Sequence, residues 1–308
     1  MVQAIIVLFG VILLVFVLAH IVPGGAARAA LGSRATPGQI ASYNRLNGYD
    51  LPIWDQLYQY VKGIVTSLDL GYSYKMNEPV KNLILERLPK TLVLVGISTA
   101  FAVIVAVPLG VLQVVRRGKV VDYAATGLSF IFYAMPAFLL GSLLIMYFAI
   151  DLHWFPVSAP SASSIGGLLS DPRGIVLPVL TLAALTIAQF SRYMRSSLME
   201  TMQEDYVRTA RAKGAGSRRV LYLHALRNAL IPIITLLGLT LPGIVSGAFI
   251  TESLFNWPGM GLLTVNAAFN DDVPLLLGTT IVITIATVVG SLLADILYAV
   301  VDPRVRYA

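Results

Sequence analysis

The chain of 308 residues is 57% hydrophobic and only 12% charged, with a mean hydropathy of +0.78, whereas soluble domains carry roughly 25% charged residues. This composition excludes an ordinary soluble protein and predicts a membrane protein. The absence of cysteine excludes disulfides, thiolate metal sites and cysteine nucleophiles. The net charge of +6 is typical of the basic loops of a membrane protein, so we do not expect nucleic-acid binding.

Six apolar stretches are long enough to cross a membrane, which takes about 20 predominantly apolar residues. The first stretch could instead be a signal peptide, because "ARA" at 27–29 resembles a cleavage site. We favour a retained span, since "MVQ" carries no positive charge and the apolar run exceeds that of an ordinary signal peptide. Prolines within the stretches, such as Pro108, Pro136 and Pro242, are tolerated in membrane helices, and we expect local kinks there without a role in transport. The predicted spans are residues 3–27, 91–115, 123–150, 174–191 (extending to about 198), 229–251 and 274–294.

The distribution of basic residues predicts the orientation of these spans, because Lys and Arg accumulate in short cytoplasmic loops. The short loops of the opposite side hold only Arg173. Both termini are therefore expected in the cytoplasm. The basic residues after the second and fourth spans and in the C-terminal tail are Arg116, Arg117, Lys119, Arg192, Arg195, Arg208, Arg211, Lys213, Arg218, Arg219, Arg227, Arg304 and Arg306.

Residues 24–90 are then predicted to lie outside the cytoplasm. Within them, "LPIWDQLYQYVKGIVTSLDLGYS" has apolar or aromatic residues at the spacing of one helix face. This spacing predicts a mostly helical cap, which either packs against the ends of the spans or receives a partner. The face consists of Ile53, Leu57, Tyr60, Val61 and Ile64.

Several kinds of chemistry have no sequence signal. There is no GxxxxGK[ST] loop for nucleotide phosphates, and no HExxH or GxSxG motif. The three histidines, His20, His153 and His224, are too scattered to suggest a metal site. The middles of the spans lack Asp, Glu, Lys and Arg, whereas ion-coupled carriers usually hold ionisable groups there. We therefore expect no enzymatic activity and no resident cofactor, and an energy source outside the chain.

Residues 196–228 are too polar to span but rich in helix-forming residues. Gly214 and Gly216 interrupt this segment, which predicts a helix, a tight turn and a second helix on the cytoplasmic side. Val207 and Ala210 are expected on one face with Gly214, leaving a shallow surface flanked by basic side chains. Asp205 near the start of the first helix suits its positive end. Two explanations stay open at this point, attraction to anionic lipid headgroups and docking of another protein.

The strings "DYVRTARAKG" (205–214) and "HALRNALIP" (224–232) resemble the cytoplasmic coupling motif of permease subunits of ABC importers, in the dipeptide and oligopeptide branch. In the general motif, Glu, Ala and Ala stand six, five and four positions before a Gly. Here only Ala210 and Gly214 match that motif. Arg208 and Thr209 depart from it and resemble the variant of the peptide branch. "LDLGYS" (68–73), "ERLPKTL" (86–92), "FNWPGMGLL" (255–263) and "DPRVR" (302–306) also stand where that family has similar strings. The uncharged "MVQAII" departs from relatives that carry basic residues before the first span.

The resemblance implies an all-α polytopic membrane protein with six transmembrane helices of the type I ABC importer permease kind. It implies a single transmembrane domain over 1–308, containing the extracytoplasmic segment 24–90 and the coupling segment 196–228. The implied partners are a second, related permease, two cytoplasmic ABC ATPases that bind ATP and Mg, an extracytoplasmic peptide-binding protein and the lipid of a bacterial or archaeal inner membrane. The residues implied in ATPase coupling are Asp205, Arg208, Thr209, Ala210, Gly214, Ser217, Arg218, Arg219 and Arg227.

The expected function is that of a permease subunit that forms half of the pathway for di- or oligopeptides. An ion-coupled secondary carrier, or a membrane scaffold without transport activity, are alternatives from other classes. Within the same branch, the resemblance also allows nickel chelates or glutathione as substrates. Dependence of transport on a proton gradient at constant ATP would distinguish a carrier from an ATP-driven importer.

Overall fold

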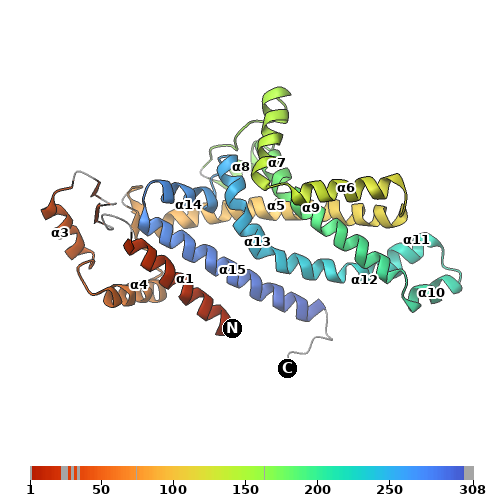
Figure 1. The fold of residues 1–308 in the computed structure, drawn as a ribbon, viewed down its shortest axis with the longest axis horizontal. Helices are drawn as coiled ribbons and strands as arrows, with labels where there is room; N and C mark the ends of the chain where they lie inside the picture. The colour runs from red at the N-terminus through yellow and green to blue at the C-terminus, as the bar shows by residue number, and fades with distance from the viewer. Residues whose placement is uncertain are drawn as a thin grey trace. The chain divides into compact units, whose positions relative to one another are not determined.

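Helices make up most of the described residues in the computed structural model (Figure 1). The structure describes residues 2–21, 27–28, 31–32, 35–73, 75–162 and 164–301, without the side chains at 2–5, 15, 18–21, 239–247, 293–295 and 297–301. The end of the first predicted span at 22–26, the side chain of His20 and the string at 302–306 therefore lie outside the described part.

The packing of the backbone divides the chain into two units. Unit 1 comprises residues 1–91 and 258–288, and unit 2 comprises residues 92–257 and 289–308. Helices α5 (Val80–Val115) and α15 (Val273–Val301) contribute to both units. Each unit has its own buried apolar clusters.

Unit 1 contains the segment between the first two predicted spans. A capping box formed by Thr36 and Gln39 starts its first complete helix, α3. Leu68, in the left-handed conformation, ends the second, α4. The prediction of a mostly helical segment is thus confirmed. Besides parts of α5 and α15, the elements of unit 1 are α1 (Val2–Ile21), α3 (Pro37–Leu46), α4 (Ile53–Ser67), the antiparallel pair β1 (Tyr72–Ser73) and β2 (Glu78–Pro79), and α14 (Met260–Phe269).

The predicted amphipathic face of α4 packs against α1 and α15, as the spacing indicated. Ile53 is the exception, because this first residue of the helix is exposed to solvent or lipid. The face therefore begins one turn later than the sequence predicted. The cluster consists of buried Ile12, Phe16, Leu57 and Ile281, with Tyr60, Val61 and Ile64 packed against it.

Unit 2 holds most of the long helices. In Figure 1 the short helices α10, α11 and α12 lie together at the end of α9. Besides parts of α5 and α15, the elements are α6 (Val120–Ala134), α7 (Ala137–Leu144), the π-helix η1 (Ile145–Asp151), α8 (Ile165–Leu169), α9 (Arg173–Thr201), α10 (Asp205–Ala212), α11 (Ser217–Arg219), the π-helix η2 (Val220–Ala225), α12 (Leu226–Ala229) and α13 (Ile231–Leu254).

Each predicted span overlaps an apolar helix, although the bounds differ. Within the described residues, four helical ranges are long and apolar enough to cross a membrane: Val80–Val115, Arg173–Thr201, Ser217–Gly238 and Val273–Leu292. A fifth crossing results if α6, α7 and η1 count as one broken span. The first predicted span corresponds to α1, whose 20 residues are nearly all apolar. The chain is therefore a polytopic helical membrane protein.

The third predicted span, residues 123–150, is not one straight helix. Helix α6 ends at Ala134, and the helical direction turns by 108° before α7 and η1 continue, as Figure 1 shows. Met135 is extended, with φ −79° and ψ 125°, because the ring of Pro136 disfavours the helical conformation of the residue before it. The expected local kink at this proline is thus a sharp break in the structure, and Pro136 is its cause.

The second predicted span begins earlier than expected. Helix α5 starts at Val80, not at residue 91, and its first turns carry several charged residues that argued against a span. Lys90 is nonetheless buried, and its Nζ lies 2.9 Å from Glu86 Oε1. An ion pair at the i, i+4 spacing stabilises a helix. Helix α5 therefore extends over residues 80–90, which are too polar to be recognised as part of a span from hydrophobicity alone.

Close packing of α5 on α9 depends on the missing side chain of Gly110. A Cβ at this position would lie 2.6 Å from Met194 Cβ and 2.9 Å from the backbone oxygen of Ser191. We expect Gly110→Ala to destabilise the protein by about 1–3 kcal/mol through overpacking, measured as a lower unfolding temperature in lipid nanodiscs. Gly96→Ala on the same helix is the control, because no described atom lies within 4 Å of its Cβ position. Equal stability of the two variants would contradict the packing of α5 on α9.

Candidate functional site

The basic segment folds as predicted into a helix, a glycine turn and further helix. Helix α10 ends in a Schellman motif, in which Ala215 N donates to Ala210 O at 3.1 Å and Gly214 N donates to Arg211 O at 2.9 Å. Gly214 has φ +83°, a conformation that only glycine adopts without strain. The glycine is thus required by the turn itself. Gly216 is extended and precedes the first residue of α11, Ser217.

The inner face of α10 is buried inside unit 2. Val207 is fully buried, and Ala210 packs against the same apolar cluster. The expectation that these two residues form an exposed shallow surface with Gly214 is therefore wrong, since they face the other helices of the unit. The cluster joins α5, α9, α10, η2, α12 and α13 through Ala106, Val111, Phe190, Met194, Leu198, Val207, Val220, Leu221, Ala225, Ala229 and Ile233.

Two hydrogen bonds add to this attachment. Asn228 Nδ2 donates to Tyr206 Oη at 2.8 Å, which joins α10 to α12. Ser197 Oγ donates to the backbone oxygen of Ala229 at 3.0 Å, which joins α9 to α12. These side chains were not among the residues predicted from the sequence. The sequence does not predict these hydrogen bonds, because their partners are far apart in the chain and come together only on folding.

The outer face of the turn is open and basic. Arg208 and Asp205 lie 3.4 Å apart with side chains 70% and 96% exposed, so their pairing contributes little to stability. Thr209 donates its hydroxyl to the backbone oxygen of Asp205 at 2.9 Å. The turn can therefore be approached by another molecule. The predicted coupling residues that are exposed are Asp205, Arg208, Thr209, Gly214, Ser217, Arg218, Arg219 and Arg227, whereas Ala210 is half-buried.

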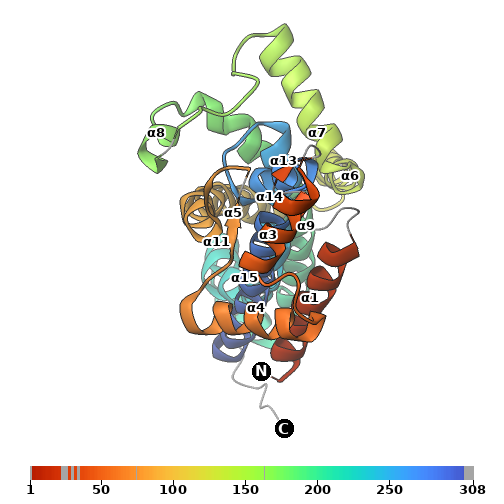
Figure 2. The ribbon, with the colours of Figure 1, turned by 90° about the vertical axis from the view of Figure 1, so that its left-hand side faces the viewer.

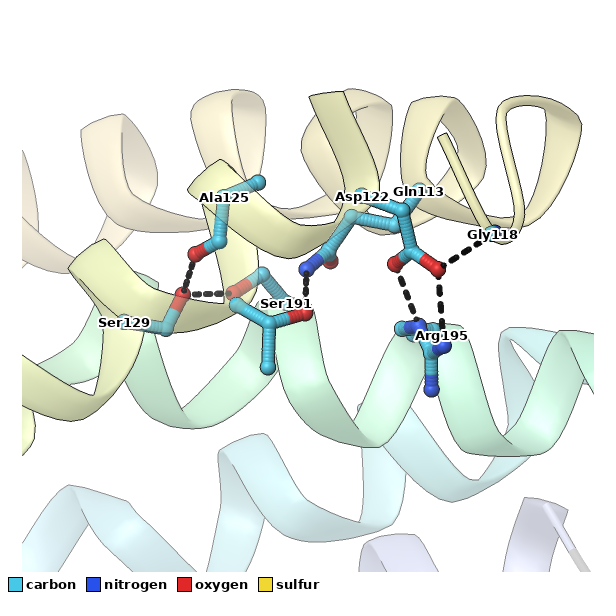
Figure 3. A network of polar contacts seen from close by, with 8 residues as sticks. Gln113, Gly118, Asp122, Ala125, Ser129, Ser191 and Arg195 are labelled. Atoms are coloured by element: carbon cyan, nitrogen blue, oxygen red, sulfur yellow. Dashed lines mark hydrogen bonds and ion pairs between the residues drawn. The ribbon is translucent and has the colours of Figure 1, made fainter. Parts of the chain in front are cut away.

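A polar network fastens α6 to α5 and α9 (Figure 3). Asp122 accepts two hydrogen bonds from Arg195, at 2.9 Å from Nε and 3.0 Å from Nη2, and a third from Gly118 N at 3.1 Å. The side chain of Asp122 is 4% exposed and that of Arg195 is 30% exposed. The sequence analysis placed Arg195 among the basic residues that follow the fourth span. In the structure it lies in α9 and forms an ion pair with Asp122.

The same network continues along α6. Gln113 Nε2 of α5 donates to Thr126 Oγ1 at 3.1 Å. Ser129 donates to the backbone oxygen of Ala125 at 2.8 Å and lies 3.4 Å from Ser191 Oγ of α9. Figure 3 shows these contacts in one row between the helices. Helices α5, α6 and α9 are thus joined by polar contacts as well as by apolar packing.

A cavity of about 610 Å³ lies in unit 1. Burial raises the pKa of the Tyr60 hydroxyl well above its ordinary value. The lining offers mostly neutral hydrogen-bonding groups. Its polar members are Asn44, Asn47, Tyr49, Gln56, Gln59, Tyr60, Asp69 and Tyr72. Among the described residues no group of three His, Asp or Glu side chains could hold a metal ion.

Comparison with known proteins places these features in a family. Residues 98–307 match the model of the "binding-protein-dependent transport system inner membrane component". Residues 1–95 match the model of the N-terminal part of such membrane components. The two models together cover nearly the whole chain, and the boundary between them falls within α5.

Relatives and solved structures agree with this match. The oligopeptide transport system permease protein AppB of Bacillus subtilis is 38% identical over 98% of this chain and 96% of its own. The dipeptide transport system permease protein DppB of Escherichia coli is 34% identical over 97% of this chain and 94% of its own. A solved amino acid ABC transporter superposes with a TM-score of 0.56 at 14% identity, over 71% of this chain and 94% of its own. The methionine ABC transporter MetNI, in an inward-facing conformation, superposes with a TM-score of 0.51 at 18% identity, over 70% of this chain and 96% of its own. The chain belongs to the family of binding-protein-dependent transport system inner membrane components.

Proposed function

We propose that this chain is a permease subunit of an ATP-driven peptide importer, in which it forms half of the translocation pathway as a single transmembrane domain. Its relatives are named for oligopeptide and dipeptide transport. The observation that carries the proposal is the turn at Gly214, which is open on its outer face and buried on its inner face. Such a turn can receive force from a partner and transmit it to α9 and α13.

The partner at this turn is proposed to be one of two cytoplasmic ATPases. The turn around Gly214 would seat in a groove of the ATPase, with Arg208, Thr209 and Ser217 at the contact, and Asp205 and the neighbouring arginines 218, 219 and 227 as charged support. ATP and Mg would be bound by the ATPases and not by this chain. Because α10 shares a buried cluster with α9 and α13, closure of the ATPases would move these helices.

The remaining partners follow from the same proposal. A second, related permease would complete the pathway, and an extracytoplasmic binding protein would deliver the peptide. The basic residues near α9, α10 and α11 support a cytoplasmic location of this face and of both termini, in the inner membrane of a bacterium or archaeon. Residues 24–90 would then lie outside the cytoplasm, and the amide and phenol groups that line the cavity of unit 1 beside Asp69 suit an amide-bearing substrate. An importer of nickel chelates or glutathione is the alternative within the branch.

The docking role of the turn can be tested by Gly214→Trp. The new Cβ meets no described atom within 4 Å, so the backbone strain at the positive φ and the changed shape of the surface offered to the ATPase are the two effects of the substitution. We expect loss of ATPase co-purification and of peptide uptake into vesicles containing the reconstituted complex.

The matched control is Gly118→Trp, in the loop between α5 and α6. Gly118 has a similar positive φ of +73°, and no described atom lies within 4 Å of its Cβ position, so the backbone strain is comparable. This variant should retain its ATPases. If Gly214→Trp binds its ATPases and transports at the normal rate, the turn is not the coupling element. Uptake that stops when the proton gradient collapses at constant ATP would instead indicate an ion-coupled carrier.

A further inference from the structure

Helix α4 carries more apolar surface than its neighbours in unit 1 cover. Trp54, Tyr58 and Val65 lie along one side of the helix, at spacings of four and seven residues. They are 72%, 65% and 77% exposed. Lys62 lies on the same side, with its Nζ 5.9 Å from the centre of the Tyr58 ring. This stripe borders the buried face at Leu57 and Val61, so the apolar arc of α4 is only partly used for packing.

The depth of α4 relative to α1 and α15 indicates what covers this stripe. With a rise of 1.5 Å per residue, the 20 residues of α1 span about 30 Å, the thickness of the hydrocarbon core. Leu57 of α4 packs with Phe16 and Ile12, which lie about 8 and 14 Å from the Ile21 end of α1. Its other neighbour, Ile281, lies about 12 Å from the start of α15. Helix α4 thus packs against the outer half of α1 and the first turns of α15, close to the ends from which the two helices enter the membrane and not beyond those ends.

The direction of α4 agrees with this depth. Figure 2 draws α4 almost along its full length, whereas α15 is strongly foreshortened, so α4 lies across the direction of the spanning helix. A helix in this position runs along the membrane plane. Its polar side, with Gln59 and Thr66, then faces away from the hydrocarbon.

The exposed residues have the chemistry of the membrane interface. Trp and Tyr are enriched where hydrocarbon meets headgroups, because their rings are apolar and their N–H or O–H groups hydrogen-bond to water. Lys can extend its ammonium group to the phosphate level while its carbon chain stays in the apolar region. We propose that α4 is an interfacial helix whose Trp54, Tyr58 and Val65 contact membrane lipid, anchoring the segment between α1 and α5 at the bilayer surface.

Site-directed spin labelling can test this directly, because the chain contains no cysteine. Single cysteines replace Trp54, Tyr58 or Val65 in the complex as purified and reconstituted into nanodiscs of phosphatidylcholine and phosphatidylglycerol. Each label is then exposed to oxygen, which concentrates in hydrocarbon, and to a water-soluble nickel chelate. We expect the label at Val65 to collide with oxygen several-fold more often than with the chelate. Gln59→Cys, on the polar side of the same helix, is the control and should show the reverse preference.

Two outcomes would overturn the proposal. Labels at positions 54, 58 and 65 that meet the nickel chelate as readily as the label at Gln59 would show that the stripe faces water. Labels that are immobilised and shielded from both reagents would show that a protein, not lipid, covers α4. The three positions are separate reporters, so failure of one variant to assemble leaves the result decided by the other two.

Discussion

Replacing Val207 by aspartate should detach α10 from the rest of unit 2 and abolish transport. Val207 is fully buried in the cluster that includes Phe190, Leu198 and Val220. A carboxylate placed there has no ion-pair partner among the residues of this cluster, and burial of such a charge costs on the order of 4 kcal/mol or more. Release of the helix is the lowest-cost response. The turn at Gly214 would then move without moving α9 or α13.

Trypsin can measure this release, because α10 and its turn contain Arg208, Arg211 and Lys213. Val207→Asp should be cut here much faster than the unmodified permease. Thr209→Asp is the matched control, since it adds the same charge two residues further on, at an exposed position of the same helix. Equal resistance of both variants would mean that the inner face of α10 is not buried. ATP hydrolysis without uptake in Val207→Asp would place the defect in coupling.

The positions of the spans and of the glycine turn could be predicted from the sequence because each depends on local properties. An apolar stretch of sufficient length has few alternatives to a membrane helix. Gly214 marks the end of α10 because a Schellman motif needs a left-handed residue. These features follow from composition and from single-residue conformational preferences, without any knowledge of the tertiary contacts.

Other features depend on contacts that the sequence pattern does not contain. A kink at Pro136 could be predicted but not its size of 108°, because proline is tolerated in some membrane helices, and Pro178 stays inside α9. The inward orientation of Val207 and Ala210 depends on η2 and α12 folding back against α9. Small residues predict close approach, but they do not show whether the approaching surface belongs to the same chain or to a partner.

The ion pair between Asp122 and Arg195 shows the same limit. The two residues are separated by more than seventy positions, and each alone resembles a charge at the membrane boundary. Only the packing of α6 on α9 brings them together, with the carboxylate almost wholly enclosed. Because the carboxylate is enclosed between two helices, removal of Arg195 alone is expected to cost much more stability than removal of one partner of an exposed pair.

Replacing Arg195 by methionine should therefore lower the free energy of unfolding by about 3 kcal/mol, because a buried carboxylate loses its counter-charge. Thermal unfolding of the purified permease in nanodiscs measures this change in the free energy of unfolding. Arg208→Met is the control, since its partner Asp205 is exposed and the expected loss is below about 1 kcal/mol.

The double variant Asp122→Leu, Arg195→Met separates a charge effect from a packing effect. Removal of both partners leaves no uncompensated charge, so we expect it to recover most of the stability that Arg195→Met loses. If the double variant is as unstable as the single one, the side chains act through their shape. If Arg195→Met is no less stable than Arg208→Met, water reaches Asp122 and the pair does not fasten α6 to α9. A stabilising pair at this place would keep α6 and α9 together. If the turn at Gly214 has the proposed coupling role, loss of the pair should lower transport even in protein that remains folded.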